Sequence, residues 1–160
     1  MQKNILVTTI MVGLIASITF ILVQPLFGMQ TLTSRHAAAY IAHGGYGDTT
    51  ALILSWGVHV GVSLVYTLLS VLIFNFNRSV FVSLGQIMFL GWATTLTATP
   101  ANEWVVKLVN TKQFPSFDTL SALNTQTGPK LWLHILFFAF VVGGIWVMNR
   151  KDTRKQRRSF

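Results

Sequence analysis

Four long apolar stretches divide the chain. They cover about residues 5–27, 51–74, 79–99 and 131–148, and none contains Asp, Glu, Lys or Arg. A helix that crosses a hydrocarbon core about 30 Å thick needs roughly 20 mainly apolar residues. Each stretch is apolar on most faces, which is typical of a membrane span rather than an amphipathic surface helix. The pattern predicts one all-α domain over residues 1–160, an integral membrane four-helix bundle.

Prolines and short polar segments mark the expected ends of these helices. Pro25 and Pro100 indicate exits from the first and third helices. The segment Asn75-Phe76-Asn77-Arg78 is a tight polar turn, so the second and third helices are expected to form an antiparallel hairpin. The first apolar run is longer than the roughly 7–15 residues of a signal-peptide core, which favours a retained helix over a cleaved leader.

Lys and Arg in the flanks of the spans predict the orientation. With both termini in the cytoplasm, eight of the twelve basic residues lie inside and four outside, as the positive-inside rule favours. The basic tail 149–160 then acts as a cytoplasmic flank that contacts anionic lipid. Six basic residues gather in the last eleven positions, so the formal net charge of +8 does not point to nucleic acid as a partner.

Two longer loops are expected on the outer side, over about residues 28–50 and 100–130. Gly44, Gly45 and Gly47 indicate an irregular course for the first. In the second, apolar positions between 102 and 109 recur at helical spacing, which predicts a short amphipathic helix at the outer interface, where it either binds the membrane or caps the helix bundle.

Composition agrees with lipid as the main solvent. Charged residues make up 10% of the chain, against about 25% in an ordinary soluble domain, and the mean hydropathy is +0.56. With no cysteine, the chain has no disulfide, thiolate metal site or cysteine nucleophile.

A polar stripe runs along the second predicted helix. In a bilayer such a stripe faces other helices or a water-filled cavity. The hydroxyl groups are read mainly as packing hydrogen bonds between helices, worth roughly 0.6 kcal/mol each. The stripe consists of Ser55, His59, Ser63, Thr67 and Ser70.

Small residues predict close helix contacts as well. Gly57 and Gly61 form a small-xxx-small pair, and Gly143 lies beside Gly144. These pairs permit packing within one chain or between chains, so a homo-oligomer or a membrane-protein partner is compatible with the sequence.

His59 and His134 are the two histidines inside the predicted spans, both in the outer half of the membrane. Either a satisfied structural histidine or a functional one fits this position. We expect an outward cavity lined by Gln24, His59, Thr94 and His134, with Gln86 deeper toward the cytoplasm.

The spacing of the histidines gives little support for a metal site or a haem site. The positions 36, 43, 59 and 134 match no ligand motif, so no metal and no cofactor is expected. An alternative stays open in which His59 and His134 ligate a haem axially between two helices.

Short matches in three of the apolar stretches resemble a known family. The first stretch contains Val12-Gly13-Leu14-Ile15-Ala16-Ser17, the second has His59 followed by Ser63, and the fourth opens on Leu133-His134-Ile135 before a basic tail. Together they are similar to the YagU-type (DUF1440-like) bacterial inner-membrane proteins, with a shorter first outer loop. The resemblance implies a bacterial inner membrane, a similar helix order and no established enzymatic activity. It makes His59 and His134 family positions.

Three functional hypotheses follow from the sequence. The leading one is a small multi-pass membrane protein without catalysis, because no nucleophile–base pair is found, with outward histidines that respond to pH. The second is a transporter or permeation protein that uses the polar face of the second helix, including Ser55 and Ser63. The third is a haem-carrying or metal-carrying subunit that uses His59 and His134.

Overall fold

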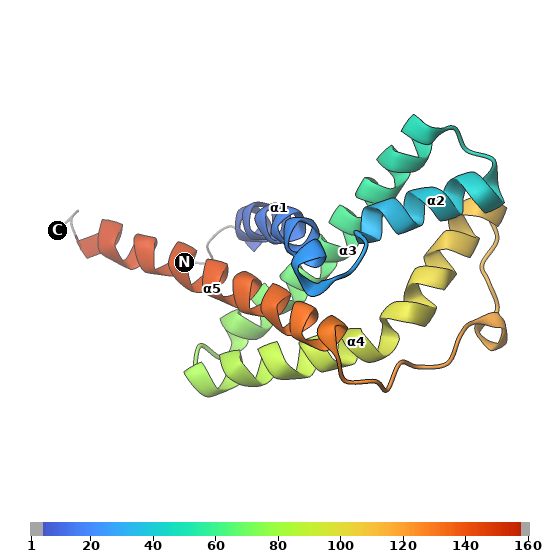
Figure 1. Ribbon diagram of the computed structural model, residues 1–160. Helices are drawn as coiled ribbons and strands as arrows, with labels where there is room; N and C mark the ends of the chain where they lie inside the picture. The colour runs from blue at the N-terminus through green and yellow to red at the C-terminus, as the bar shows by residue number, and fades with distance from the viewer. Residues whose placement is uncertain (1–4, 158–160) are drawn as a thin grey trace.

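The computed structural model describes residues 5–157, with side chains as far as Asn149, and all regular structure in that range is helical (Figure 1). Four of its helices are long and apolar enough to cross a membrane, as the sequence predicts. The elements are α1 (Ile5–Val23), η1 (Gln24–Phe27), α2 (Leu32–Gly44), α3 (Asp48–Phe76), α4 (Val80–Thr111), η2 (Phe117–Thr119) and α5 (Pro129–Arg157). The last three residues of the predicted basic tail lie outside the described residues.

Helices α1 and α5 lie side by side in the middle of the bundle, with α3 packed on α1 and α4 packed on α5. The turn between α3 and α4 is as short as predicted, and side-chain oxygens of Asn77 and Ser79 close it by accepting backbone N–H groups. Yet α3 and α4 contact each other little, because they diverge from the turn as the two arms of a V (Figure 1). The start of α1 and the end of α5 lie at the same end of the molecule as this turn.

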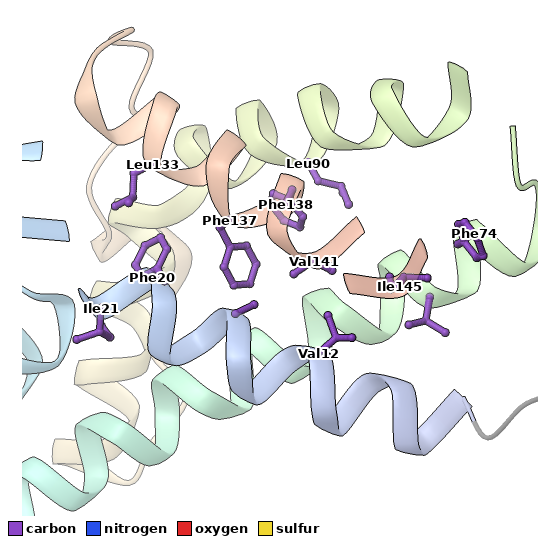
Figure 2. Packing of buried hydrophobic residues seen from close by; sticks show 12 residues of the cluster. Val12, Phe20, Ile21, Phe74, Leu90, Leu133, Phe137, Phe138, Val141 and Ile145 are labelled. Atoms are coloured by element: carbon purple, nitrogen blue, oxygen red, sulfur yellow. The ribbon is translucent and has the colours of Figure 1, made fainter. Parts of the chain in front are cut away.

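The core lies along the contact between α1 and α5. Figure 2 shows Val12 and Phe20 of α1 facing Phe137, Val141 and Ile145 of α5. All five side chains are buried.

The outside of the bundle is apolar as well. Ile53 and Val65 of α3 are each 67% exposed and Phe81 of α4 is 87% exposed. Exposure of so large an apolar surface to water is unfavourable, whereas contact between the same surface and lipid is not. The distribution of side chains therefore agrees with helices surrounded by lipid.

Three glycines permit the closest helix crossings. A Cβ at Gly91 of α4 would lie 3.1 Å from the backbone of Ile135 in α5, and one at Gly13 of α1 would lie 2.8 Å from Leu64 in α3. Gly144 makes a similar contact with α1. By contrast, Gly57 and Gly61 have no such neighbour, so the predicted contact at this pair is not made within the described chain.

The third span does not end at Pro100, contrary to the sequence prediction. Helix α4 continues through this proline to Thr111, so the amphipathic segment 102–109 is its second half rather than a separate helix. Figure 1 shows α4 changing direction in this region. Proline lacks the N–H that would bind the carbonyl of Leu96, and a bend is the usual result. The backbone N–H of Asn124, from the loop after α4, donates to that carbonyl instead at 2.9 Å.

The loop predicted over residues 28–50 is not irregular, because it contains α2. The Thr31 hydroxyl caps the start of α2 by accepting the N–H of Ser34, and Gly45 ends the helix with a left-handed φ of 66°. Glycine is suited to that conformation because it has no Cβ. Helix α2 packs against both α3 and α4, so it bridges the open end of the V.

Replacement of Gly91 by Ala tests the α4–α5 crossing. The added methyl group meets the Ile135 backbone, so we expect Gly91→Ala to lower the free energy of unfolding by about 1–3 kcal/mol. Gly85→Ala is the matched control in the same helix, because nothing lies within 4 Å of its Cβ position. The control should be neutral or stabilising by about 0.5–1 kcal/mol. Thermal unfolding in detergent, followed by circular dichroism, measures both; equal melting temperatures would contradict the predicted tight crossing.

Candidate functional site

A cavity of about 600 Å³ lies at the end of the bundle where α2 bridges α3 and α4. Its walls come from the end of α1, from α2, from the second half of α4 and from the first turns of α5. The residues that line it are Phe20, Gln24, Met29, Leu32, Arg35, His36, Ala39, His43, Ala98, Thr99, Asn102, Glu103, Val106, Lys107, Asn110, Thr111, Lys130, Leu133 and His134.

Helix α2 presents one face to this cavity. Leu32, Arg35, His36, Ala39 and His43 follow one another at helical spacing, so they share that face. The chain before the helix fixes its position, because the buried Gln24 side chain accepts the N–H of Leu32 at 2.7 Å. Gln24, predicted as a cavity residue, therefore both lines the cavity and holds the start of α2.

The bent half of α4 forms the opposite wall and carries the loop that follows it. The Glu103 carboxylate accepts two hydrogen bonds from Ser121, one from its backbone N–H at 2.8 Å and one from its hydroxyl. The Lys107 ammonium donates to the carbonyl of Thr119 at 2.6 Å. With the bond from Asn124 to Leu96, these contacts hold residues 119–124 along α4.

His36 is a polar side chain of the cavity wall that lacks a partner. It is 5% exposed, and neither ring nitrogen has a hydrogen-bond partner in the part of the chain that the structure describes. Burial lowers its pKa from 6.5 to about 4, with smaller contributions from the charge of Arg35 and from His59. Buried polar groups without partners are costly. A polar group bound at this wall would reduce that cost.

His134 is held by a short hydrogen-bond network between α4 and α5. The Thr95 hydroxyl donates to the carbonyl of Gly91 at 2.7 Å, and the same oxygen lies 2.9 Å from His134 Nδ1. A hydroxyl has one proton, so this network assigns the ring proton to Nδ1 and leaves Nε2 as an acceptor. His134 thus brings a fixed imidazole to the cavity, as the sequence predicts for its position.

His59 does not line the cavity, although the sequence places it there. Its Nε2 lies 3.0 Å from the carbonyl of Ser17, so it links α3 to α1. The ring of Phe20 contacts both His59 and His134, with centroid distances of 5.5 and 5.8 Å. Of the two histidines that were predicted as a pair, His134 thus lines the cavity, whereas His59 lies in the contact between α3 and α1.

The other candidate residues of the sequence lie in helix contacts outside the cavity. The stripe of α3 is its buried face against α1, where Ser55 donates to the carbonyl of Leu52 and Ser63 accepts from Thr67 through its carbonyl. On α4, the Gln86 amide and the Thr94 hydroxyl are buried and have no partner among the described residues. None of these four candidates, Ser55, Ser63, Gln86 and Thr94, lines the cavity.

Several residues of the cavity were absent from the sequence prediction. Arg35, His36, Glu103, Lys107 and Lys130 lie in segments that were predicted as loops or as an interfacial helix. The signal that could have located them is the helical spacing of Leu32, Arg35, His36 and Ala39 behind a Thr31 cap. Among the described residues, no three of His, Asp and Glu come together as a metal-binding group.

Comparison of the chain with known protein families, with curated proteins and with solved structures found no match. The resemblance to the YagU-type proteins accordingly stays a prediction, and the function is inferred from the cavity itself.

The low pKa of His36 predicts a loss of stability in acid. The unfolded chain binds a proton at His36 below pH 6.5, whereas the folded protein binds it only below about pH 4. Stability should therefore fall between pH 6.5 and pH 4, because the unfolded state binds more protons in that interval. Groups that act on this imidazole are Arg35 and Tyr40 on α2 and His59 on α3.

Melting temperatures in detergent between pH 7.5 and pH 4 measure this effect in the wild type and in His36→Gln. The variant should lose less stability in acid, because Gln does not titrate. His43→Gln, at an exposed position of the same helix, is the control and should behave as the wild type does. An acid-induced loss that is the same in all three proteins would rule out His36 as its source.

Substitution of Pro100 tests how α4 holds the loop. Pro100→Ala restores a backbone N–H that binds the Leu96 carbonyl within the helix, so the bond from Asn124 should be lost. Hydrogen exchange of the segment 119–126 should become about fivefold faster, as expected for one hydrogen bond of about 1 kcal/mol. Pro115→Ala, in the loop itself, serves as the control. Unchanged exchange in Pro100→Ala would show that the loop is held by other contacts.

Proposed function

We propose that this chain is a non-catalytic, multi-pass protein of a bacterial inner membrane that binds a small, largely apolar molecule in the cavity beside α2. The observation that carries the proposal is the cavity of about 600 Å³, whose wall exposes mainly apolar surface although twelve of its nineteen lining residues are polar or charged. Sites for small molecules are typically clefts of about 300–1,000 Å³ with such a lining.

The polar groups at the wall suit binding rather than catalysis. His36 is buried without a partner, and His134 offers Nε2 as an acceptor. No Ser, Thr or carboxylate side chain among the lining residues is paired with an imidazole as a nucleophile would be with its base. Groups of this kind orient a ligand through hydrogen bonds, which supports a role as a binding protein.

The orientation that we propose places the cavity on the outer side of the membrane. The excess of Lys and Arg near the ends opposite the cavity supports it, since Arg78 lies at the α3–α4 turn and the basic tail begins in the last turns of α5. A molecule outside the cell or in the outer leaflet would then reach the site directly.

The other hypotheses from the sequence have weaker support in the geometry. The polar face of α3 is engaged in packing against α1, where a permeation path would need accessible polar groups. For haem, the two imidazoles do not face a common space, because His134 lines the cavity, His59 does not, and the Phe20 ring contacts both. A visible absorption spectrum of the purified protein tests haem directly.

Photolabelling with a decanol that carries a diazirine in its chain tests the binding proposal. In nanodiscs, the label should concentrate on the cavity-lining peptides of α2, α4 and α5. Ala98→Trp places a bulky indole in the cavity and should reduce labelling of those peptides about tenfold or more, because the ligand loses apolar contacts. The matched control is Ala101→Trp, one turn along the same helix at an exposed position outside the cavity.

Circular dichroism and gel filtration verify that both variants fold as the wild type does. Equal labelling of the cavity peptides in Ala98→Trp and Ala101→Trp would refute the proposal. Labels confined to exposed apolar residues such as Ile53 and Phe81 would refute it as well, because they would show partition into lipid alone.

A further inference from the structure

The charges around the cavity are mainly positive. Arg35, Lys107 and Lys130 line it, and Glu103 is the one carboxylate among the lining residues. A cavity with a low-dielectric wall and one excess sign of charge concentrates that potential in its interior. The same cavity is therefore biased toward an anionic group.

Two of the three cations are free to meet such a group. Lys107 donates a hydrogen bond to the carbonyl of Thr119, and Glu103 accepts one from the backbone N–H of Ser121. Both side chains therefore bind the loop that lies along α4. In the part of the chain that the structure describes, neither the Arg35 guanidinium nor the Lys130 ammonium has an ion-pair or hydrogen-bond partner. Both are exposed. They also come from different elements, α2 and α5, which face the cavity from separate walls.

Most of the surface that the lining residues expose to the cavity is nevertheless apolar. Phe20 comes from α1, Leu32 and Ala39 from α2, Val106 from α4 and Leu133 from α5. A purely ionic ligand would leave this surface unused, and a purely apolar ligand would leave the two cations unpaired. The combination fits an amphiphile.

We infer that the cavity takes a single-chain amphiphile whose anionic head group, a carboxylate or a phosphate, binds Arg35 and Lys130. The alkyl chain of this ligand lies against Phe20, Leu32 and Leu133. The inference rests on the proposed binding function and adds the chemical class of the ligand. One chain is favoured over a two-chain phospholipid because the volume of about 600 Å³ is that of a site for a drug-sized molecule.

The test compares two photoprobes with the same diazirine-bearing decyl chain, one ending in a carboxylate and the other in a hydroxyl. The concentration for half-maximal labelling of the cavity peptides is measured in phosphatidylcholine nanodiscs for the wild type, Arg35→Gln and Lys130→Gln. Each variant is compared with the wild type for the same probe, so the partition of that probe into lipid cancels. Lys112→Gln is the matched control, because it removes the same charge just beyond α4 at a position that does not line the cavity.

For the carboxylate probe, Arg35→Gln and Lys130→Gln should each raise that concentration about tenfold, the loss expected for one charge-assisted hydrogen bond. Labelling by the alcohol should change less than twofold, and Lys112→Gln should match the wild type with both probes. Added NaCl should weaken carboxylate labelling of the wild type and leave alcohol labelling unchanged. The salt dependence is measured on the wild type alone, so it tests the inference even if a substitution impairs folding.

Two outcomes would overturn the inference while the proposed function stands. In the first, the alcohol labels the cavity but the carboxylate responds neither to salt nor to Arg35→Gln and Lys130→Gln. In the second, native mass spectrometry from mixed nanodiscs shows one phosphatidylglycerol retained by the wild type and lost in Ala98→Trp, which would make a two-chain bilayer lipid the occupant. Failure of both probes to label the cavity would instead refute the binding function itself.

Discussion

The missing N–H at Pro100 is the constraint on which the arrangement of helices around the cavity depends. Inside lipid each backbone polar group needs a partner, and proline leaves the carbonyl of Leu96 without its usual one. The N–H of Asn124 supplies that partner, so the loop after α4 lies along the helix rather than free. The accompanying bend turns the second half of α4 into a separate wall, against which α2 closes the cavity.

The rest of the bundle is held by close contacts between nearly apolar helices. Water does not drive these helices together within lipid, so association depends on van der Waals contact and on interhelical hydrogen bonds. Gly13 and Gly91 bring α1 to α3 and α4 to α5, and His59 joins α3 to α1 through the carbonyl of Ser17. The polar stripe of α3 is thus a packing surface, and the cavity lies elsewhere, where the helices diverge.

The sequence by itself identified only part of the cavity wall, because it predicted loops where the structure has α2 and the second half of α4. Gln24 and His134, which the sequence analysis assigned to a cavity, both line the one described here, and each lies near the end of a recognisable span. His36 was not included, since the 13 residues of α2 are too few to cross a membrane and the segment was predicted as a loop. Its burial depends on the packing of α2 against α3 and α4, which the local sequence does not determine.

The sequence alone determined that there are four helices long and apolar enough to span a membrane, approximately where they lie, and that α3 and α4 are joined by a short turn. These features follow from long apolar runs and from local turn residues, which act over a few neighbouring positions. Tertiary structure decided that α3 and α4 diverge, that α4 continues through Pro100, and that Arg35 and Lys130 line one cavity. Such features depend on which helices pack together, and the contacts that fix this packing join residues far apart in the chain.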